Sequence, residues 1–514
     1  MTLKLVYRIL RQLSDWTVDG FYSEVYVEGA ENVPKGRSTH HALFRLRATQ
    51  TATMGPPRRC YSSRPTAAIA KGEVAGVFSE GASYSEPTIV QIMSGTAWAA
   101  VEYTRWREEH AKDGPELVIV PVGLVYTEKD TFKSRIRVHY GSPISMADYS
   151  QELFGISPGA DPNDVGYAVA HKISSRIEKE LFDMTVNAND WETLFAAQTA
   201  RAILWGDDKN VDLKHWGVVS QTLVDLLSYH PTAEPPPEPI RLAKTSLVKY
   251  FSLLHYTGLS HTTLESVIPS TSHIPSLLPS LKSVLLFPMA IPAMLLHVPA
   301  CITAELTLKL FAQTDEWEGF AQYRSVGGGI GVGIGIAVMY RCASHFLRDG
   351  EFGVPALEWM KYAVTRRGNV GKLISFLAFG WTMIKWYALF SGGIHRRAKT
   401  FLATVRVIAG ILLPPSSILK ADRYKKLPPP PPSNAFIRRR RNAEGTSAEF
   451  WDKKEKEAEQ SAPPPVAPRK LIRQLLEQRK ETMGQLSRTL VELEGTEKYG
   501  ERIARLKETG AKIN

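Results

Sequence analysis

The residues best suited to binding or catalysis lie between positions 77 and 87, where a short apolar run leads into a turn. The turn carries a carboxylate at Glu80, a glycine at Gly81 and a hydroxyl at Ser83. A glycine lets the backbone approach a phosphate closely. A carboxylate would repel a phosphate, so we expect Glu80 to accept a hydrogen bond from a ligand hydroxyl or a neighbouring N–H. The pattern therefore predicts a buried strand that leads into a glycine turn carrying a carboxylate and hydroxyls.

Strands must position this turn, and four are predicted around it. Two of them alternate apolar and polar residues, which is typical of a half-buried strand; in the last one, Ile136, Val138 and Tyr140 share a face. The other two are apolar runs that predict buried strands. The four segments are residues 22–28, 73–78, 117–122 and 135–140.

A helix is predicted at residues 88–106, between the second and third strands. Its apolar residues recur every four positions, at Ile89, Met93, Ala97 and Val101, which places them on one face. Strand, helix and strand in this order indicate a mixed or parallel sheet with crossover helices. The predicted fold class is therefore an α/β domain, followed by a helical, membrane-embedded region and a tail that is mostly disordered or helical.

The turn closely resembles the F-P-E-G-x-S motif of the glycerolipid acyltransferases. Phe78, Glu80, Gly81 and Ser83 match the pattern, and Ser79 stands where proline is usual. The loss of that proline relaxes the turn but removes no polar group. The resemblance implies that these residues help to bind the acceptor substrate.

Further matches follow in the order that the family shows. Val120, Pro121 and Val122 resemble its hydrophobic V-P-V/G block, which is also expected at the substrate site. Residues 27–34 resemble the opening of the domain, and residues 135–144 resemble the strand and turn that end it. The combination is closest to the fungal-type enzymes with C-terminal membrane spans, which residues 187–205 also resemble.

The resemblance implies an acyl-CoA-dependent O-acyltransferase. Its acceptor would be glycerol 3-phosphate or dihydroxyacetone phosphate, in the synthesis of phospholipid and triacylglycerol. The family works at the endoplasmic reticulum membrane with its catalytic domain in the cytosol, and neither a metal nor a tightly held cofactor is implied. The rival hypothesis is a catalytically dead, acyltransferase-like membrane scaffold or interaction protein.

The partner motif of the family, H-x-x-x-x-D, is absent from its expected place. His40 is followed five positions later by Arg45, and His41 by Leu46; residues 32–72 contain no Asp or Glu. The base that acyl transfer requires therefore has no orienting carboxylate nearby, and the catalytic residues are unknown.

The interval at residues 37–66 lacks helical and strand periodicity, so we expect it to form no ordered part of the sheet. It resembles out-of-frame or mis-spliced translation more than a domain segment. Arg58, Arg59 and Arg64 could bind phosphate, although a disordered basic loop is the favoured interpretation.

The composition of the 514 residues limits the partners. A net charge of +11 and a pI near 9.3 favour an anionic partner such as a membrane surface or a phosphorylated substrate. Nucleic acid is not expected, because no recognisable reading motif accompanies the charge. Cys60, Cys301 and Cys342 are too few and too scattered for a disulfide framework or a structural zinc site, which favours a chain that faces the cytosol.

Four apolar runs predict helices that associate with membrane lipid. The first, at residues 284–304, has no Asp, Glu, Lys or Arg, which favours a membrane span over a core helix. The other three fit a buried core about equally well, because each is short or carries a charge. We expect two or four spans, which would leave the basic tail on the cytosolic side. The three shorter runs are residues 326–340, 373–390 and 401–414.

The predicted C-terminal helix has apolar residues at spacings of three and four, such as Leu486, Leu490 and Leu493. This spacing fits a short coiled coil or a helix that docks on a partner. The complete predicted organisation is an acyltransferase-like domain at 1–150, a helical accessory region at 151–280, membrane-associated helices at 281–415, a Pro/Arg-rich linker at 416–469 with basic residues 438–441, and an amphipathic helix at 470–510.

Overall fold

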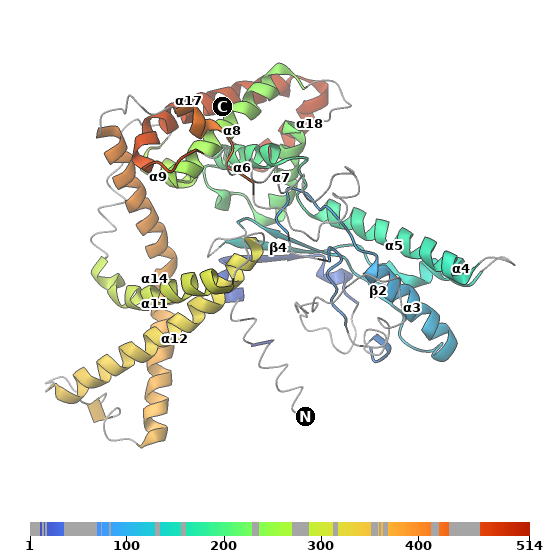
Figure 1. Ribbon diagram of the computed structural model, residues 1–514, viewed down its shortest axis with the longest axis horizontal. Coiled ribbons are helices and arrows are strands. Elements are labelled where there is room, and N and C mark those ends of the chain that lie inside the picture. The colour runs from blue at the N-terminus through green and yellow to red at the C-terminus, as the bar shows by residue number, and fades with distance from the viewer. Residues whose placement is uncertain are drawn as a thin grey trace.

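The structure of the protein is a computed structural model. It describes residues 18–34, 69–128, 134–155, 161–228, 236–269, 287–311, 317–350, 368–412, 421–430 and 463–513, apart from residues 73, 82 and 83, and a few isolated positions besides. The described chain is mostly helical with a few strands, and its long helices extend away from the sheet (Figure 1). The predicted interval at 37–66 and the basic residues 438–441 lie outside the described residues.

A three-stranded mixed sheet lies at the centre of the fold. It has the order β1 (Glu24–Glu28), β4 (Arg135–Tyr140), β3 (Val122–Tyr126). β1 runs parallel to β4, and β3 runs antiparallel to it, so the predicted mixed sheet is present. A separate antiparallel pair joins β2 (Val118–Ile119) to β5 (Ile144–Ser145).

The buried strand predicted at residues 73–78 is wrong. The described residues 74–78 have no strand structure, and Val74 and Phe78 are 63% and 54% exposed. An apolar run becomes a buried strand only when a neighbouring strand pairs with its backbone, and none of the described strands pairs with this one. The strand predicted at 117–122 is instead divided into β2 and β3 at Pro121, because proline has no N–H to donate to a ladder.

The predicted helix at residues 88–106 is present as α3 (Gly95–His110), but it begins seven residues later. Ala97 and Val101 are fully buried on its apolar face, as predicted. Ile89 and its neighbour Val90 precede the helix, because their N–H groups donate to the side chains of Asn187 and Tyr84 instead of to a helical ladder. α3 packs against α5 (Pro162–Met184) over a shared apolar core.

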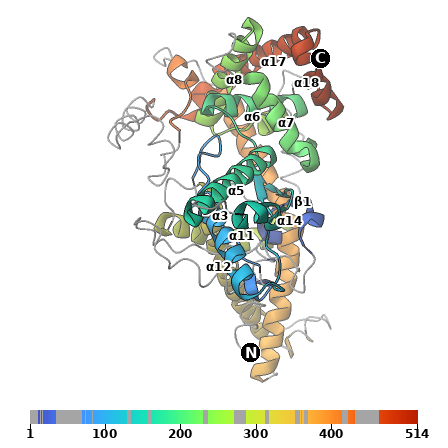
Figure 2. The same ribbon diagram turned by 90° about the vertical axis from the view of Figure 1, so that its right-hand side faces the viewer.

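A helical layer covers the sheet and carries the largest core. Figures 1 and 2 show its five helices grouped beyond one face of the sheet. Asp190 and Asp212 begin two of them by accepting hydrogen bonds from the N–H groups of Thr193 and Lys214. The five are α6 (Trp191–Trp205), α7 (Leu213–Leu227), α8 (Glu238–Thr257), α17 (Ile472–Glu494) and α18 (Glu497–Glu508). The other short described elements are η1 (Ala30–Asn32), η2 (Met146–Tyr149), α4 (Ser150–Phe154), η3 (Asp208–Asn210), α9 (His261–Val267), η4 (Ala421–Lys425) and η5 (Pro468–Leu471).

The C-terminal amphipathic region is two helices, and its apolar stripe is covered by the chain itself. α17 packs along α8, and Leu486, Leu490 and Leu493 are buried in the shared core. Buried polar side chains also cross this interface, because the Ser246 hydroxyl lies 2.8 Å from the hydroxyl of Thr482. The stripe that predicted a coiled-coil partner is thus satisfied within one chain.

Two of the predicted membrane runs form a close-packed helical hairpin, α11 (Phe287–Phe311) and α12 (Trp317–Asp349). A Cβ on Gly331 would lie only 2.6 Å from Cα of Ala300, so the backbones meet where glycine has no side chain. The Thr303 hydroxyl donates to the carbonyl of Gly327 across the hairpin, at 2.6 Å. Residues Tyr323–Asp349 form the one helix, among those the structure describes, that is long and apolar enough to cross a membrane.

The runs predicted separately at 373–390 and 401–414 are parts of a single helix, α14 (Asn369–Leu412). Arginine and lysine are good helix formers, so the basic residues between the runs continue the helix. Leu373 and Trp381 near its start are exposed, whereas Ala403 and Val407 near its end are buried against the helical layer. In Figure 1, α14 runs from the α12 region to α9 and α17.

A buried histidine lies where α8, α9 and α17 meet. His261 is 3% exposed, and its Nδ1 lies 2.9 Å from the Tyr250 hydroxyl. Burial, and then the nearby positive charge of Arg479, lower the pKa of His261 from 6.5 to about 4, and Glu265 opposes this shift only in part. The folded protein therefore holds a neutral imidazole at this position.

We expect this histidine to make the fold sensitive to acid. The unfolded chain takes up its proton near pH 6.5 and the folded chain only near pH 4, so the stabilisation is present above pH 6.5 and is lost as the pH falls through this window. The difference amounts to about 3 kcal/mol of unfolding free energy. Denaturant unfolding of His261→Gln between pH 7 and pH 4 should show a flatter pH dependence than the unchanged chain. His171→Gln, at an exposed position, is the control and should keep the original slope; equal slopes for both variants would contradict the assignment.

Candidate functional site

The turn at residues 78–81 is held by hydrogen bonds, although the strand predicted before it does not form. The N–H of Gly81 donates to the carbonyl of Phe78 at 3.1 Å, and the N–H of Met93 donates to the carbonyl of Ser79 at 2.6 Å. The Ser79 hydroxyl lies 3.1 Å from the hydroxyl of Thr96 in the first turn of α3. These contacts fix the turn against the segment that leads into α3.

The carboxylate of Glu80 is held by a buried tyrosine. Tyr84 is 8% exposed, and its hydroxyl accepts a hydrogen bond from the N–H of Val90 at 3.1 Å. Burial, followed by the charge of Glu80 and a hydrogen bond to it, raises the pKa of Tyr84 far above its ordinary range. The backbone carbonyl of Glu80 also accepts a hydrogen bond from Gln91, at 3.1 Å. The tyrosine thus stays protonated and orients the Glu80 carboxylate, and sequence reasoning did not identify it.

Glycine is required at position 81 for two reasons. Its φ is +76°, and a Cβ there would lie 2.8 Å from Cγ of Met93. Gly72 has a similar φ of +73° but open space around it, so the pair separates backbone strain from crowding. Gly81→Ala is expected to destabilise the protein by about 1 to 3 kcal/mol more than Gly72→Ala. Thermal unfolding of both variants checks this, and equal losses would show that the turn is loosely packed.

The segment that follows the turn is tied to the helical layer by Asn187. Its side-chain carbonyl accepts from the N–H of Ile89 at 3.0 Å and from the hydroxyl of Thr88 at 3.2 Å. The N–H of Ala188 donates to the carbonyl of Pro87 at 2.9 Å, and the Asn187 N–H donates to Gln221 of α7 at 2.8 Å. Asn187 therefore joins residues 87–89 to α7.

The other predicted site residues are distributed as follows. Val120, Pro121 and Val122 connect β2 to β3; Pro121 is buried, and its carbonyl accepts from the N–H of Gly141 at 2.9 Å. Ile119, just before the block, and Ile92, which follows the turn by eleven residues, pack against the same apolar core as α3 and α5. Ser83 and both histidines of the interval, His40 and His41, lie outside the described residues, as do Arg58, Arg59 and Arg64.

The chemistry that the described turn offers is hydrogen bonding. Glu80 is an oriented hydrogen-bond acceptor, whereas Met93 occupies the space beside Gly81 where a Cβ would stand, and the Gly81 N–H already donates to Phe78. In the part of the chain that the structure describes, no group of three or more His, Cys, Asp or Glu side chains could hold a metal ion. The arrangement offers a hydrogen-bond acceptor to a ligand that carries a donor.

Comparison with known proteins confirms the resemblance to the glycerolipid acyltransferases. Glycerol-3-phosphate O-acyltransferase 2 of Saccharomyces cerevisiae is 30% identical over 128 residues, which are 25% of this chain and 16% of that protein. Glycerol-3-phosphate O-acyltransferase 1 of the same yeast is 28% identical over 144 residues, 28% of this chain and 18% of the relative. An uncharacterized acyltransferase of Schizosaccharomyces pombe is 27% identical over 135 residues, 26% of this chain and 18% of the relative.

The similarity is local. The chain matches less than a fifth of the length of each of these curated relatives. No protein-family model matches the chain, and no solved structure matches it.

Proposed function

We propose that the chain has the architecture of an acyl-CoA-dependent O-acyltransferase that acts on glycerol 3-phosphate or dihydroxyacetone phosphate. The observation that carries this proposal is the local similarity to two yeast proteins named glycerol-3-phosphate O-acyltransferase. The Glu80–Gly81 turn supports it, because an oriented carboxylate suits an acceptor that carries a hydroxyl.

The reaction would require a precise set of groups. The acceptor hydroxyl attacks the thioester carbonyl, its proton passes to a base, the C–S bond breaks and coenzyme A leaves as a thiol after protonation. Glu80 would accept a hydrogen bond from an acceptor hydroxyl, and Phe78 and the Val120–Val122 block would line the same side of the site. The base would come from the interval at 37–66, where His41 is one of two histidines.

Membrane attachment forms part of the proposal. Apolar side chains at half exposure or more follow one another along α11, α12 and α14, for example Ile302, Ile330 and Leu377. Lipid is a better environment than water for such rows. Lys385 lies 5.9 Å from the ring of Trp381, a combination that suits the border between lipid and water. We place these helices in the endoplasmic reticulum membrane and the sheet on the cytosolic side.

A second candidate function is a non-catalytic membrane scaffold. The observation that favours it is the absence of Asp and Glu from residues 32–72, because the interval then has no carboxylate to orient a histidine. In that case the sheet and the helical layer would serve protein contacts only.

An acyl-transfer assay separates the two candidates. Membranes from cells that express the full chain would receive acyl-CoA and either labelled glycerol 3-phosphate or labelled dihydroxyacetone phosphate. A labelled monoacyl product above the level of control membranes supports the enzyme and identifies its acceptor. Glu80→Gln should raise the KM for the acceptor, because the amide accepts hydrogen bonds more weakly than a carboxylate. No product from either acceptor would favour the scaffold.

A further inference from the structure

The face of the sheet beneath α7 carries a row of charged residues. In the β1–β4 register, Glu24 pairs with Arg135, and Glu28 pairs with His139, so these side chains share one face with Arg137. α7 packs over β4 and β1 on this face. Charged groups under a helix are costly unless each one finds a partner, so the partners of the arginines decide what the row does.

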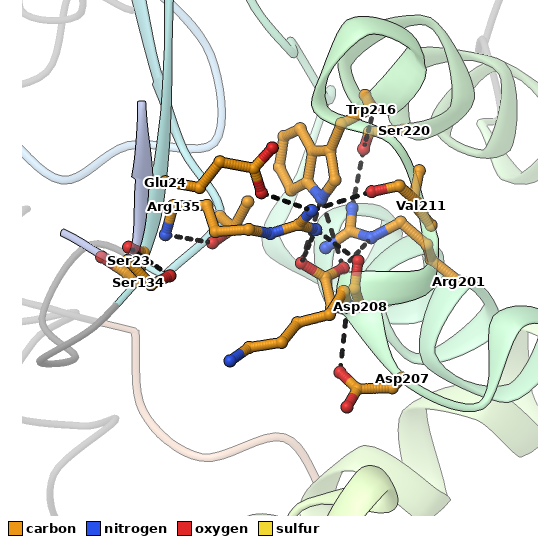
Figure 3. A network of polar contacts seen from close by, with 12 residues as sticks. Ser23, Glu24, Ser134, Arg135, Arg201, Asp207, Asp208, Val211, Trp216 and Ser220 are labelled. Atoms are coloured by element: carbon orange, nitrogen blue, oxygen red, sulfur yellow. Dashed lines mark hydrogen bonds and ion pairs between the residues drawn. The ribbon is translucent and has the colours of Figure 1, made fainter. Parts of the chain in front are cut away.

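Arg135, at one end of the row, is fully engaged. Its guanidinium donates to the carbonyl of Val211 at 2.9 Å and to the carbonyl of Asp208, and lies 3.5 Å from the carboxylate of Glu24 (Figure 3). The role of Arg135 is therefore structural, since its N–H groups join β4 to the connection between α6 and α7.

Arg137, two residues further along the same face, is not fully engaged. It is 6% exposed, and one N–H donates to the carboxylate of Glu28 at 2.6 Å. Its Nε is buried without a hydrogen-bond partner, and so is Nδ1 of the neighbouring His139. Buried polar atoms without a partner are uncommon in folded proteins, because each costs free energy until a ligand or water satisfies it, and here two lie on neighbouring residues of one strand face.

The surroundings favour an anion as that ligand. Lys214, an exposed residue in the first turn of α7, lies near enough to Glu28 for its charge to act on that carboxylate. The pKa of Glu28 reflects these positive charges. Burial raises this pKa, but the hydrogen bond from Arg137 and the charges of Arg137, His139 and Lys214 lower it, and the net effect is a lowered pKa. Two permanent cations thus face one carboxylate.

The group has a closed side and an open side. A Cβ on Gly217 of α7 would lie 2.6 Å from Nη1 of Arg137, so the helix backbone closes over the guanidinium. The side chain of Glu28 is 36% exposed, and Lys214 is exposed next to it. An anion would therefore arrive past Glu28 and Lys214.

We propose that Arg137 and His139 form a binding site for a small oxyanion of the phosphate class, which displaces the carboxylate of Glu28 from Arg137. Lys214 attracts the anion at the open side, and Glu28 competes with it. The site is separate from the Glu80 turn in sequence and stands whether or not the chain transfers acyl groups.

The test measures anion binding to the purified full-length chain by isothermal titration calorimetry. Inorganic phosphate, glycerol 3-phosphate and coenzyme A are the probes, and glycerol is the uncharged control. Tighter binding of glycerol 3-phosphate than of phosphate would assign a phosphate monoester, and tighter binding of coenzyme A would assign a nucleotide phosphate. Binding of glycerol alone would overturn the proposal.

The variants should act in opposite directions. Glu28→Gln removes the competing charge and should tighten anion binding about tenfold, whereas Lys214→Gln and His139→Asn should weaken it several-fold. Arg137→Lys should weaken it about tenfold or more, because lysine cannot present the planar donor edge. Lys480→Gln, at an exposed position on α17, is the matched control and should have no effect.

Loss of folding in one variant would not invalidate the binding test. Arg137 is buried, so its variant can lose structure, but Glu28 and Lys214 are accessible and their variants test the site without disturbing the core. If the unchanged chain and Glu28→Gln bind none of the charged probes, the inference is overturned and the group is a hydrated part of the core. The same conclusion follows if Lys214→Gln and Glu28→Gln bind as Lys480→Gln does.

Discussion

Acyl transfer to glycerol 3-phosphate by the 514-residue chain is expected to be about 10²- to 10⁴-fold slower than by a chimera in which residues 37–66 are replaced by a segment carrying H-x-x-x-x-D. The physical reason is the missing carboxylate. A lone histidine has no partner to fix its tautomer or direct its ring toward the acceptor hydroxyl. Misplacement of the base relative to the Glu80 turn would lower the rate further.

The matched control for this experiment is the same chimera with the inserted histidine and aspartate changed to alanine. It has the same length and differs at only those two residues, so it separates the chemistry of the motif from any repair of folding. Activity in the first chimera alone would show that the rest of the chain is a competent acyltransferase. Robust activity in the 514-residue chain itself would refute the expectation, and His41→Gln would then test whether His41 is the base.

The sequence predicted the alternating strands well because alternation is a local property. β1 and β4 lie within the segments expected for them, and Ile136 and Val138 are buried on the predicted face. The opposite face, with Arg135, Arg137 and His139, received no role. Its meaning depends on the register with β1, which pairs residues more than 100 positions apart and leaves no local signal.

Predictions from apolar runs were wrong where the burial of a run depends on another segment that packs against it. Residues 74–78 are exposed although they are apolar, because no described strand accepts their backbone hydrogen bonds. α14 joined two predicted runs, since the boundary between them was drawn at charged residues that favour a helix. Periodicity alone shows that a face is apolar, and only the assembled chain shows what covers it.

The candidate site shows the same division. Glu80 and Gly81 were identified from the resemblance, and the structure gives them an oriented carboxylate and a positive φ. Tyr84 and Asn187, which hold the turn and the segment after it, were not identified. Tyrosine and asparagine are common in loops and strands, so neither residue type predicts a role. Tyr84 acquires its role by accepting from the N–H of Val90. Asn187 acquires its role by accepting from the N–H of Ile89, about 100 residues earlier in the chain.

Asp208→Ala is expected to destabilise the protein by about 3 to 5 kcal/mol, the largest effect of any single substitution considered for stability. Its carboxylate accepts from Nε of Arg201 at 2.6 Å and from Nε1 of Trp216 at 3.1 Å, and lies 3.5 Å from Arg135 (Figure 3). Arg135 and Arg201 are 5% and 6% exposed. Removal of Asp208 would leave two buried guanidinium groups without their shared carboxylate, which water cannot readily replace.

The neighbouring residue provides a matched control. The carboxylate of Asp207 accepts one hydrogen bond, from the N–H of Lys209 at 3.0 Å, and contacts no arginine in Figure 3. Asp207→Ala should therefore cost only about 1 kcal/mol, the usual effect of a lost helix cap. Denaturant unfolding of both variants, monitored by the fluorescence of Trp216 and the other tryptophans, measures the difference. Similar losses at the two positions would mean that the arginines find other partners. A much larger loss at Asp208 would show that a single carboxylate joins β4 of the sheet to the α6–α7 connection, and hence the sheet to the helical layer.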